Sequence, residues 1–163
     1  MTSYSHSRSP HALRRSELVL LALADPKEGD ALSTHLELEG FTTLTTDLGA
    51  IALALAAKEE PDLIILDLIL SDLSAYEVSR ALKASPCTRG ITRVAITDSV
   101  AAVMPEGAHG AGLSECFCRP ITPTQLLSRI RSLLPQMNRE QSQGSRRVWP
   151  PIRRHRYSPY RAH

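Results

Sequence analysis

Aromatic residues are scarce in this chain of 163 residues, since Phe, Trp and Tyr together make up only 4%. A core with so few rings has to be filled by aliphatic side chains, and hydrophobic residues of all kinds reach 42%. This composition disfavours an aromatic-rich β-sandwich. It favours a Leu, Ile, Val and Ala sheet that is covered by helices.

Cysteine is also rare, and an odd number of three gives no disulfide framework. No Cys or His pair has the spacing of a zinc site, so we expect no metal there. Free thiols indicate a reducing compartment, and we expect a cytoplasmic protein. No apolar run approaches the roughly 20 residues of a membrane-spanning helix, and we expect no membrane span.

The charges are unevenly distributed, although the net charge is only +2. Residues 1–16 carry +3, residues 17–135 carry −7 and residues 136–163 carry +6. Both ends are polar and lack a hydrophobic period, which predicts a disordered basic leader at 1–16 and a disordered Arg-rich tail at 136–163. The acidic middle, 17–135, is predicted to form one domain.

Short apolar runs alternate with amphipathic segments through this middle part. The expected strands cover residues 18–23, 41–46, 63–67, 93–97 and 115–118. The expected helices cover residues 27–39, 47–58, 75–84, 99–110 and 123–134. Strict alternation predicts a doubly wound α/β fold, in which a five-stranded parallel sheet lies between two helical layers.

Local signals mark several helix ends. Ser74 and Thr122 each stand three residues before a Glu or Gln, which is the pattern of a capping box. Gly40 stands where a C-terminal cap belongs. Asp47 is predicted to cap the helix that follows it.

Three polar residues stand at or just after the ends of predicted strands: Asp67, Thr97 and Arg119. Functional sites in parallel α/β sheets gather at the carboxyl ends of the strands, so we expect these side chains at one rim. Each residue alone also has an ordinary explanation. Asp67 is then a turn cap, Thr97 satisfies local backbone groups and Arg119 is a solvated surface residue.

The stretch from Pro61 to Val78 resembles the segment around the phosphoacceptor aspartate of bacterial response-regulator receiver domains. The resemblance extends over about residues 17–135 and implies a flavodoxin-like (βα)5 fold. It places the phosphoacceptor position on Asp67, and the phosphate-contact positions on Thr97 and Arg119. Three positions in register make a specific match, whereas any one of them would be weak.

The sequence departs from this family at the metal site. Counted from Pro26, the two carboxylates that hold Mg²⁺ in the family fall on Leu23 and Ala24, and neither side chain can bind a metal. Asp25 comes one position too late, so its side chain should point elsewhere. We therefore expect no cofactor, with Mg²⁺ bound only if Asp67 is phosphorylated.

Three further departures lie around the phosphate position. Arg119 replaces the lysine of the family, Cys116 stands at the aromatic switch position and Ala75 replaces a usual glycine. A guanidinium binds carboxylates bidentately and stays protonated. We therefore predict a permanent Asp67–Arg119 ion pair in place of the phosphate contact.

The expected function is that of an atypical, stand-alone receiver module in two-component-type signal transduction. It would bind a sensor histidine kinase or a downstream signalling protein, with weak or no Mg²⁺-dependent phosphorylation at Asp67. The face of the fourth helix, fifth strand and fifth helix is the expected contact, and a homodimer through this face is plausible. A tail of fewer than thirty residues with three prolines is too short for a winged-helix output domain.

Two alternatives remain open. One is a conventional phosphoacceptor response regulator that uses Asp67. The other is a small adaptor whose tail, with Trp149 and Tyr157 among its arginines, binds nucleic acid or another anionic partner. An enzyme with Asp67 as nucleophile is disfavoured, because the first strand is followed by neither an Asp-x-Asp motif nor a Gly-rich turn.

Overall fold

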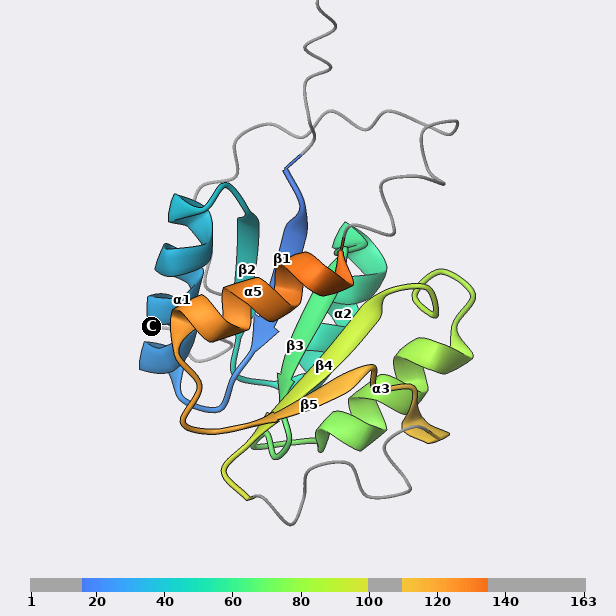
Figure 1. Cartoon of the computed structure of the whole chain (residues 1–163). Helices are drawn as coiled ribbons and strands as arrows, with labels where there is room; N and C mark the ends of the chain where they lie inside the picture. Colours follow the sequence, from blue (N-terminus) through green and yellow to red (C-terminus); the bar gives the residue numbers. More distant parts are fainter. Residues whose placement is uncertain (1–15, 100–109, 135–163) are drawn as a thin grey trace, which may run out of the picture.

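The structure is a computed structural model that describes residues 16–99 and 110–134 (Figure 1). The strands are β1 (Leu18–Ala22), β2 (Thr42–Thr46), β3 (Leu63–Asp67), β4 (Thr92–Thr97) and β5 (Glu115–Cys118). The helices are α1 (Pro26–Leu38), α2 (Gly49–Glu59), α3 (Ala75–Ala84) and α5 (Pro123–Leu133). None of these described helices has the length and apolarity that a bilayer crossing needs.

Several predicted segments lie outside the described residues. These are nearly all of the helix expected at 99–110, the basic leader and the Arg-rich tail. The other predicted strands and helices are present, with ends that agree with the expectation or differ from it by at most two residues.

All five strands are parallel and lie in the order β2-β1-β3-β4-β5. Helices α1 and α5 cover one face of the sheet, and α2 and α3 cover the other (Figure 1). Alternate residues of β1 belong to the two cores: Leu20 packs toward α2 and α3, whereas Leu21 packs toward α1 and α5. The predicted doubly wound fold is confirmed, and its continuous apolar strands are those of a sheet covered on both faces.

The capping boxes predicted at Ser74 and Thr122 are both present. Gly40 follows α1 with a positive φ of 95°, as expected for a residue that ends a helix. These two boxes position the starts of α3 and α5, the helices that follow β3 and β5.

The prediction that Asp47 caps α2 is wrong. The cap residue is Leu48, which makes no side-chain capping bond. The carboxylate of Asp72 instead accepts hydrogen bonds from Gly49 N at 2.7 Å and Ala50 N at 2.9 Å. Asp72 lies in the turn between β3 and α3, so a rule that considers only sequence neighbours could not find this cap.

The segment that leads into β5 is anchored by three side chains from α3 and β4. Lys83 Nζ donates to the carbonyl of Gly110 at 3.2 Å, and Ser79 Oγ donates to that of Ala111 at 2.7 Å. Buried Arg93 donates from Nε to the carbonyl of Gly112 at 3.0 Å. These bonds fix the path of the chain into β5, at whose far end Arg119 stands.

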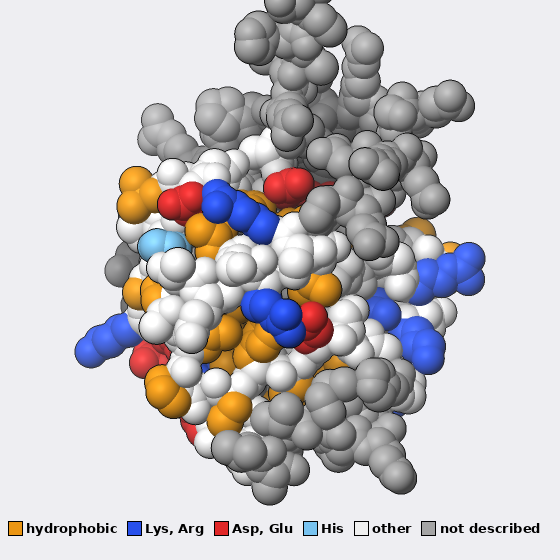
Figure 2. Space-filling view, viewed as in Figure 1, with side chains coloured by type: hydrophobic (Ala, Val, Ile, Leu, Met, Phe, Trp, Pro, Cys, Tyr) orange, Lys and Arg blue, Asp and Glu red, His pale blue; other side chains and the backbone are white. Residues whose placement is uncertain are grey.

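The face covered by α1 and α5 carries positive and negative side chains close together, with hydrophobic side chains exposed among them (Figure 2). Arg131 of α5 donates to Glu39 at 2.7 Å. Arg129 lies 3.4 Å from Glu115 and over the ring of Phe117. Among the described residues this face therefore carries paired charges rather than a field of one sign.

Candidate functional site

Asp67 and Arg119 meet at the carboxyl edge of the sheet. Asp67 ends β3 and Arg119 follows β5, so the long arginine side chain reaches past the end of β4. Arg119 Nη1 donates to Asp67 Oδ1 at 3.1 Å, and Nη2 donates to Oδ2 at 3.0 Å. The predicted ion pair is present and bidentate, with side chains only 12% (Asp67) and 18% (Arg119) exposed.

A second carboxylate, that of Glu28 on α1, holds the other edge of the same guanidinium. Arg119 Nε donates to Glu28 Oε1 at 3.0 Å, and Nη2 donates to Oε2 at 2.8 Å. Exposed Asp98 adds a longer contact of 3.5 Å to Nη1. Nothing in the sequence pointed to Glu28, because an acid in the first turn of a helix is ordinarily explained by the helix dipole.

These carboxylates change the acidity of Arg119. The hydrogen bonds that Arg119 donates to Glu28 raise the pKa of the guanidinium, partial burial lowers it, and the hydrogen bonds to Asp67 and the charge of Asp67 raise it again. The net direction is upward from an already high value, so Arg119 stays protonated in this site.

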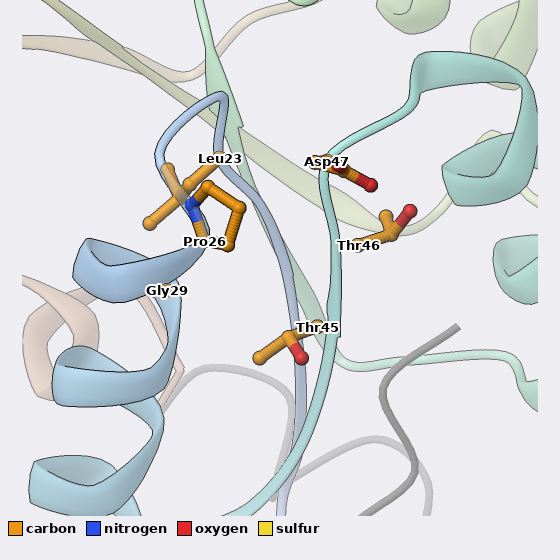
Figure 3. A pocket seen from close by; sticks show the side chains of 6 residues that line it. All are labelled: Leu23, Pro26, Gly29, Thr45, Thr46 and Asp47. Atoms are coloured by element: carbon orange, nitrogen blue, oxygen red, sulfur yellow. The ribbon is translucent and has the colours of Figure 1, made fainter. Parts of the chain in front are cut away.

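The end of β1 contributes a backbone group instead of side-chain oxygens. Ala24 N donates to Asp67 Oδ2 at 3.1 Å. The side chain of Leu23 is 1% exposed and lies beside Pro26 at the start of α1, where both line a shallow notch across from Thr45 (Figure 3). Asp25 points away from the site, as predicted, and caps α1 by accepting from Lys27 N at 2.9 Å.

The residues at this edge do not fit a Mg²⁺ ion. Magnesium needs several hard oxygen ligands in near-octahedral geometry. Leu23 and Ala24 supply no side-chain oxygen, and both oxygens of Asp67 already accept from Arg119. Within residues 16–99 and 110–134, no three His, Cys, Asp or Glu side chains form a group that could hold a metal.

Thr97 lies at the end of β4, between the strands that carry Asp67 and Arg119. Its hydroxyl accepts a hydrogen bond from Ser99 N at 3.1 Å, and its carbonyl accepts one from Arg119 N at 2.8 Å. The structure therefore brings Thr97 to the expected edge, with its hydroxyl used locally and its backbone placing Arg119.

Cys116 is half-buried on β5 and packs against the core under α2 and α3. It lies near Tyr76 of α3, whose pKa is raised by burial and by the neighbouring thiol. Ala75 is fully buried at the start of α3, and its N–H donates to the carbonyl of Leu68 at 2.9 Å. All three cysteines are free thiols, as expected.

Comparisons with known sequences point to one family. Residues 19–131 match the family model described as the response regulator receiver domain. The DNA-binding response regulator MtrA of Mycolicibacterium smegmatis is 30% identical over 116 residues, which are 71% of this chain and 50% of that protein. Response regulator PleD of Caulobacter vibrioides is 36% identical over 106 residues, 63% of this chain and 22% of that protein. The chain thus spans half or less of the length of these relatives.

Solved structures show the same fold. Chemotaxis response regulator CheY4 of Vibrio cholerae has a TM-score of 0.68 and 22% identity, covering 74% of this chain and 100% of that one. The receiver domain of sensor histidine kinase PA1611 from Pseudomonas aeruginosa, solved with magnesium in its active site cleft, has a TM-score of 0.65 and 22% identity, covering 74% and 98%. The family model matches well over half of the chain, and the chain accordingly belongs to the response regulator receiver domains of two-component signal transduction.

Proposed function

We propose that this receiver acts without Mg²⁺-dependent phosphorylation of Asp67 and signals by binding protein partners. The observation that carries the proposal is the double contact of Asp67 with Arg119, at 3.1 and 3.0 Å. A carboxylate attacks a phosphoryl donor through a free oxygen, and here both oxygens are engaged. In this proposal Asp67 occupies the position of the phosphoacceptor in the family, and Thr97 and Arg119 occupy the positions that contact the phosphate there.

The strength of this contact supports the proposal. Charge-assisted, bidentate hydrogen bonds in a partly buried site are worth about 2 kcal/mol together. Because this contact must be broken before Asp67 can react, it reduces the fraction of Asp67 that is free to react by roughly 30-fold, before any chemistry takes place. A lysine in place of Arg119 would hold Asp67 less firmly, because it is a point charge without a planar fork.

The charge of the site supports it as well. Phosphoryl donors are anionic, and receiver domains typically neutralise them with Mg²⁺. Here Glu28 and Asp98 add two negative charges around the single positive charge of Arg119. Leu23 and Ala24 stand in the metal positions and can hold no cation there that would offset the repulsion between these carboxylates and an incoming phosphoryl group.

Receiver domains bind histidine kinases and downstream effector proteins. For this chain we place the contact on β5 and α5, where an open groove runs between the strand and the helix and is lined by Phe117, Ile121 and Arg129. Cys116 at the switch position also lines it. This surface does not require phosphorylated Asp67 in order to be presented, and a cytoplasmic location would expose it to such partners.

Incubation with phosphoramidate and Mg²⁺, followed by intact mass measurement, tests the proposal. We expect no phosphoryl adduct on the wild type. The double variant Ala24→Asp/Arg119→Lys restores one acidic ligand and releases Asp67, and should gain an adduct that is lost when Asp67→Asn is added. Arg129→Gln, outside the site, is the matched control and should behave as the wild type.

Two outcomes would overturn the proposal. A stable adduct on the wild type that disappears in Asp67→Asn would identify a conventional phosphoacceptor. Repeated consumption of the donor would identify an enzyme.

A further inference from the structure

The guanidinium of Arg119 has five N–H groups, and each has an acceptor. The end formed by Nη1 and Nη2 holds Asp67, and the side edge formed by Nε and Nη2 holds Glu28. The fifth N–H, on Nη1, points to Asp98 at 3.5 Å. Arg119 therefore has no donor left for another ligand.

The two carboxylates reach Arg119 in different ways. Asp67 lies deep in the site and is additionally held by Ala24 N at 3.1 Å. Glu28 comes from the first turn of α1, and its side chain is 30% exposed. Of the two carboxylates that bind Arg119 through two hydrogen bonds, Glu28 is thus the more exposed and the one that solvent reaches more easily.

We propose that Glu28 is a tethered anion that fills, on Arg119, the place an oxyanion would take in a receiver with an open site. This inference rests on the proposed function and names what keeps the site closed. A carboxylate and a phosphate both present two oxygens at a spacing that fits the guanidinium fork. Glu28 is attached to the same chain, so its binding to Arg119 is intramolecular and does not depend on the concentration of an anion in solution.

Removal of the Glu28 carboxylate should open an anion site. The side edge of Arg119 would lose both of its acceptors from α1, and the sum of charges over Arg119 and its three carboxylate partners would change from −2 to −1. The vacated place lies beside the N-terminal turn of α1, where backbone N–H groups also favour an anion. Inorganic phosphate is the simplest probe for such a site.

The test is a melting experiment on the full chain with and without inorganic phosphate, at equal ionic strength in sodium chloride. For Glu28→Ala we expect phosphate to raise Tm by about 5 °C, because the ligand binds only the folded state. For the wild type the same addition should change Tm by less than about 1 °C. Glu28→Gln keeps one acceptor without the charge and should give an intermediate shift.

Two controls connect the effect to Arg119. Asp30→Ala removes one exposed carboxylate from the same helix and should respond as the wild type does. Glu28→Ala/Arg119→Met has neither the tethered anion nor the guanidinium, and should lose the phosphate response. The inference is overturned if Glu28→Ala responds no more than the wild type, or if the double variant keeps the response.

A spectroscopic readout separates this inference from the proposed function. The Nε–Hε signal of Arg119 in a ¹H–¹⁵N spectrum, assigned by its absence in Arg119→Lys, should be protected from exchange in the wild type and unprotected in Glu28→Ala. An unprotected signal in the wild type contradicts the tethered anion, even if Asp67 takes no phosphoryl group. Conversely, a phosphorylated wild type contradicts the proposed function, even if this signal behaves as expected.

Discussion

At the scale of single residues, Leu23 and Ala24 are neighbours in opposite environments. Leu23 is buried between the sheet and α1, in the core that also contains Leu126 and Ile130 of α5. Ala24 is exposed, and its N–H faces Asp67. The two expected metal positions therefore differ in how easily each one can accept a carboxylate.

We predict that Leu23→Asp lowers the free energy of unfolding by about 4 kcal/mol, because it removes a core side chain and buries an unpaired charge. Ala24→Asp should cost less than about 1 kcal/mol, since its side chain reaches solvent. Urea denaturation measures both, and Leu23→Met is the control that keeps the volume. Equal losses for the two Asp variants would contradict this assignment of environments.

Gly29 and Gly49 make a second matched pair. A methyl group on Gly29, which lines the notch in Figure 3, would meet nothing within 4 Å. Gly29→Ala should therefore stabilise the domain by about 0.5–1 kcal/mol, through helix propensity. On Gly49 the same methyl would lie 2.8 Å from Leu73 Cβ, and Gly49→Ala should destabilise by about 1–3 kcal/mol. Thermal unfolding of both variants checks the opposite signs.

Part of the site could be predicted from single residues and part could not. Asp67 and Arg119 were identifiable because parallel strands bring their carboxyl ends to one edge, wherever those ends lie in the sequence. Glu28 was not, because its contact with Arg119 spans 91 residues and depends on how α1 is rotated against the sheet. Thr97 lies at the predicted edge of the sheet, but its hydroxyl accepts a local hydrogen bond from Ser99 N.

At the scale of elements, Asp72 joins two parts of the fold that the chain does not connect directly. It lies in the turn that follows Asp67, and its carboxylate caps α2 through Gly49 N and Ala50 N. Burial raises the pKa of Asp72, but these backbone hydrogen bonds lower it more, so the folded-state pKa lies below the ordinary 3.8. The turn that carries the candidate site is thereby tied to a neighbouring helix.

The depressed pKa gives a prediction with a definite sign. Asp72 contributes stability that is present above its unfolded pKa, near 3.8, and lost as the pH falls through the lower folded value. Asp72→Asn should lower the free energy of unfolding by about 1 kcal/mol at pH 7, as the loss of a helix cap does. Below the folded pKa the difference from the wild type should shrink, whereas Asp30→Asn controls for the loss of a surface charge. A difference that grows toward low pH would contradict the cap.

Strands β1 and β3 were predictable to within one residue because each is a short apolar run buried on both faces, whereas β2 was predictable from its β-branched, alternating residues. Helix α2 was misjudged at its start because the cap comes from Asp72, beyond the reach of a local pattern. The anchoring of Gly112 by buried Arg93 was equally hidden, since a sequence gives no sign that an arginine will bind carbonyls rather than solvent.

At the scale of the whole molecule, the charges separate an acidic body from basic ends. Residues 17–135 carry −7, and residues 136–163 carry +6. The fold class followed from the alternating pattern, because that pattern reflects the whole sheet. The family followed from the resemblance of the segment from Pro61 to Val78. The role of the basic ends could not be predicted in the same way. An Arg-rich composition is compatible with binding to nucleic acid, with binding to an anionic surface and with simple exposure to solvent.

Removal of residues 136–163 changes the net charge from +2 to −4, which gives a prediction for the whole chain. If the tail binds nucleic acid, the full chain should bind a short labelled duplex at low salt, with an affinity that falls steeply as salt increases. The truncated chain should bind at least about 10-fold more weakly, as measured by fluorescence anisotropy. Equal binding by both chains, or none by the full chain, would assign no nucleic-acid role to the tail.

The arrangement around Arg119 has a consequence for how such a protein could be controlled in a cell. The carboxylates of Asp67 and Glu28 lie 2.8–3.1 Å from the guanidinium, and under the proposed function they occupy the place that a reversible phosphoryl modification would need. The signal would then depend on the amount of the protein in the cell. Under the proposed function, synthesis and degradation of the protein would control the signal, as a kinase and a phosphatase do for a phosphorylated receiver. The response would last as long as the protein is present.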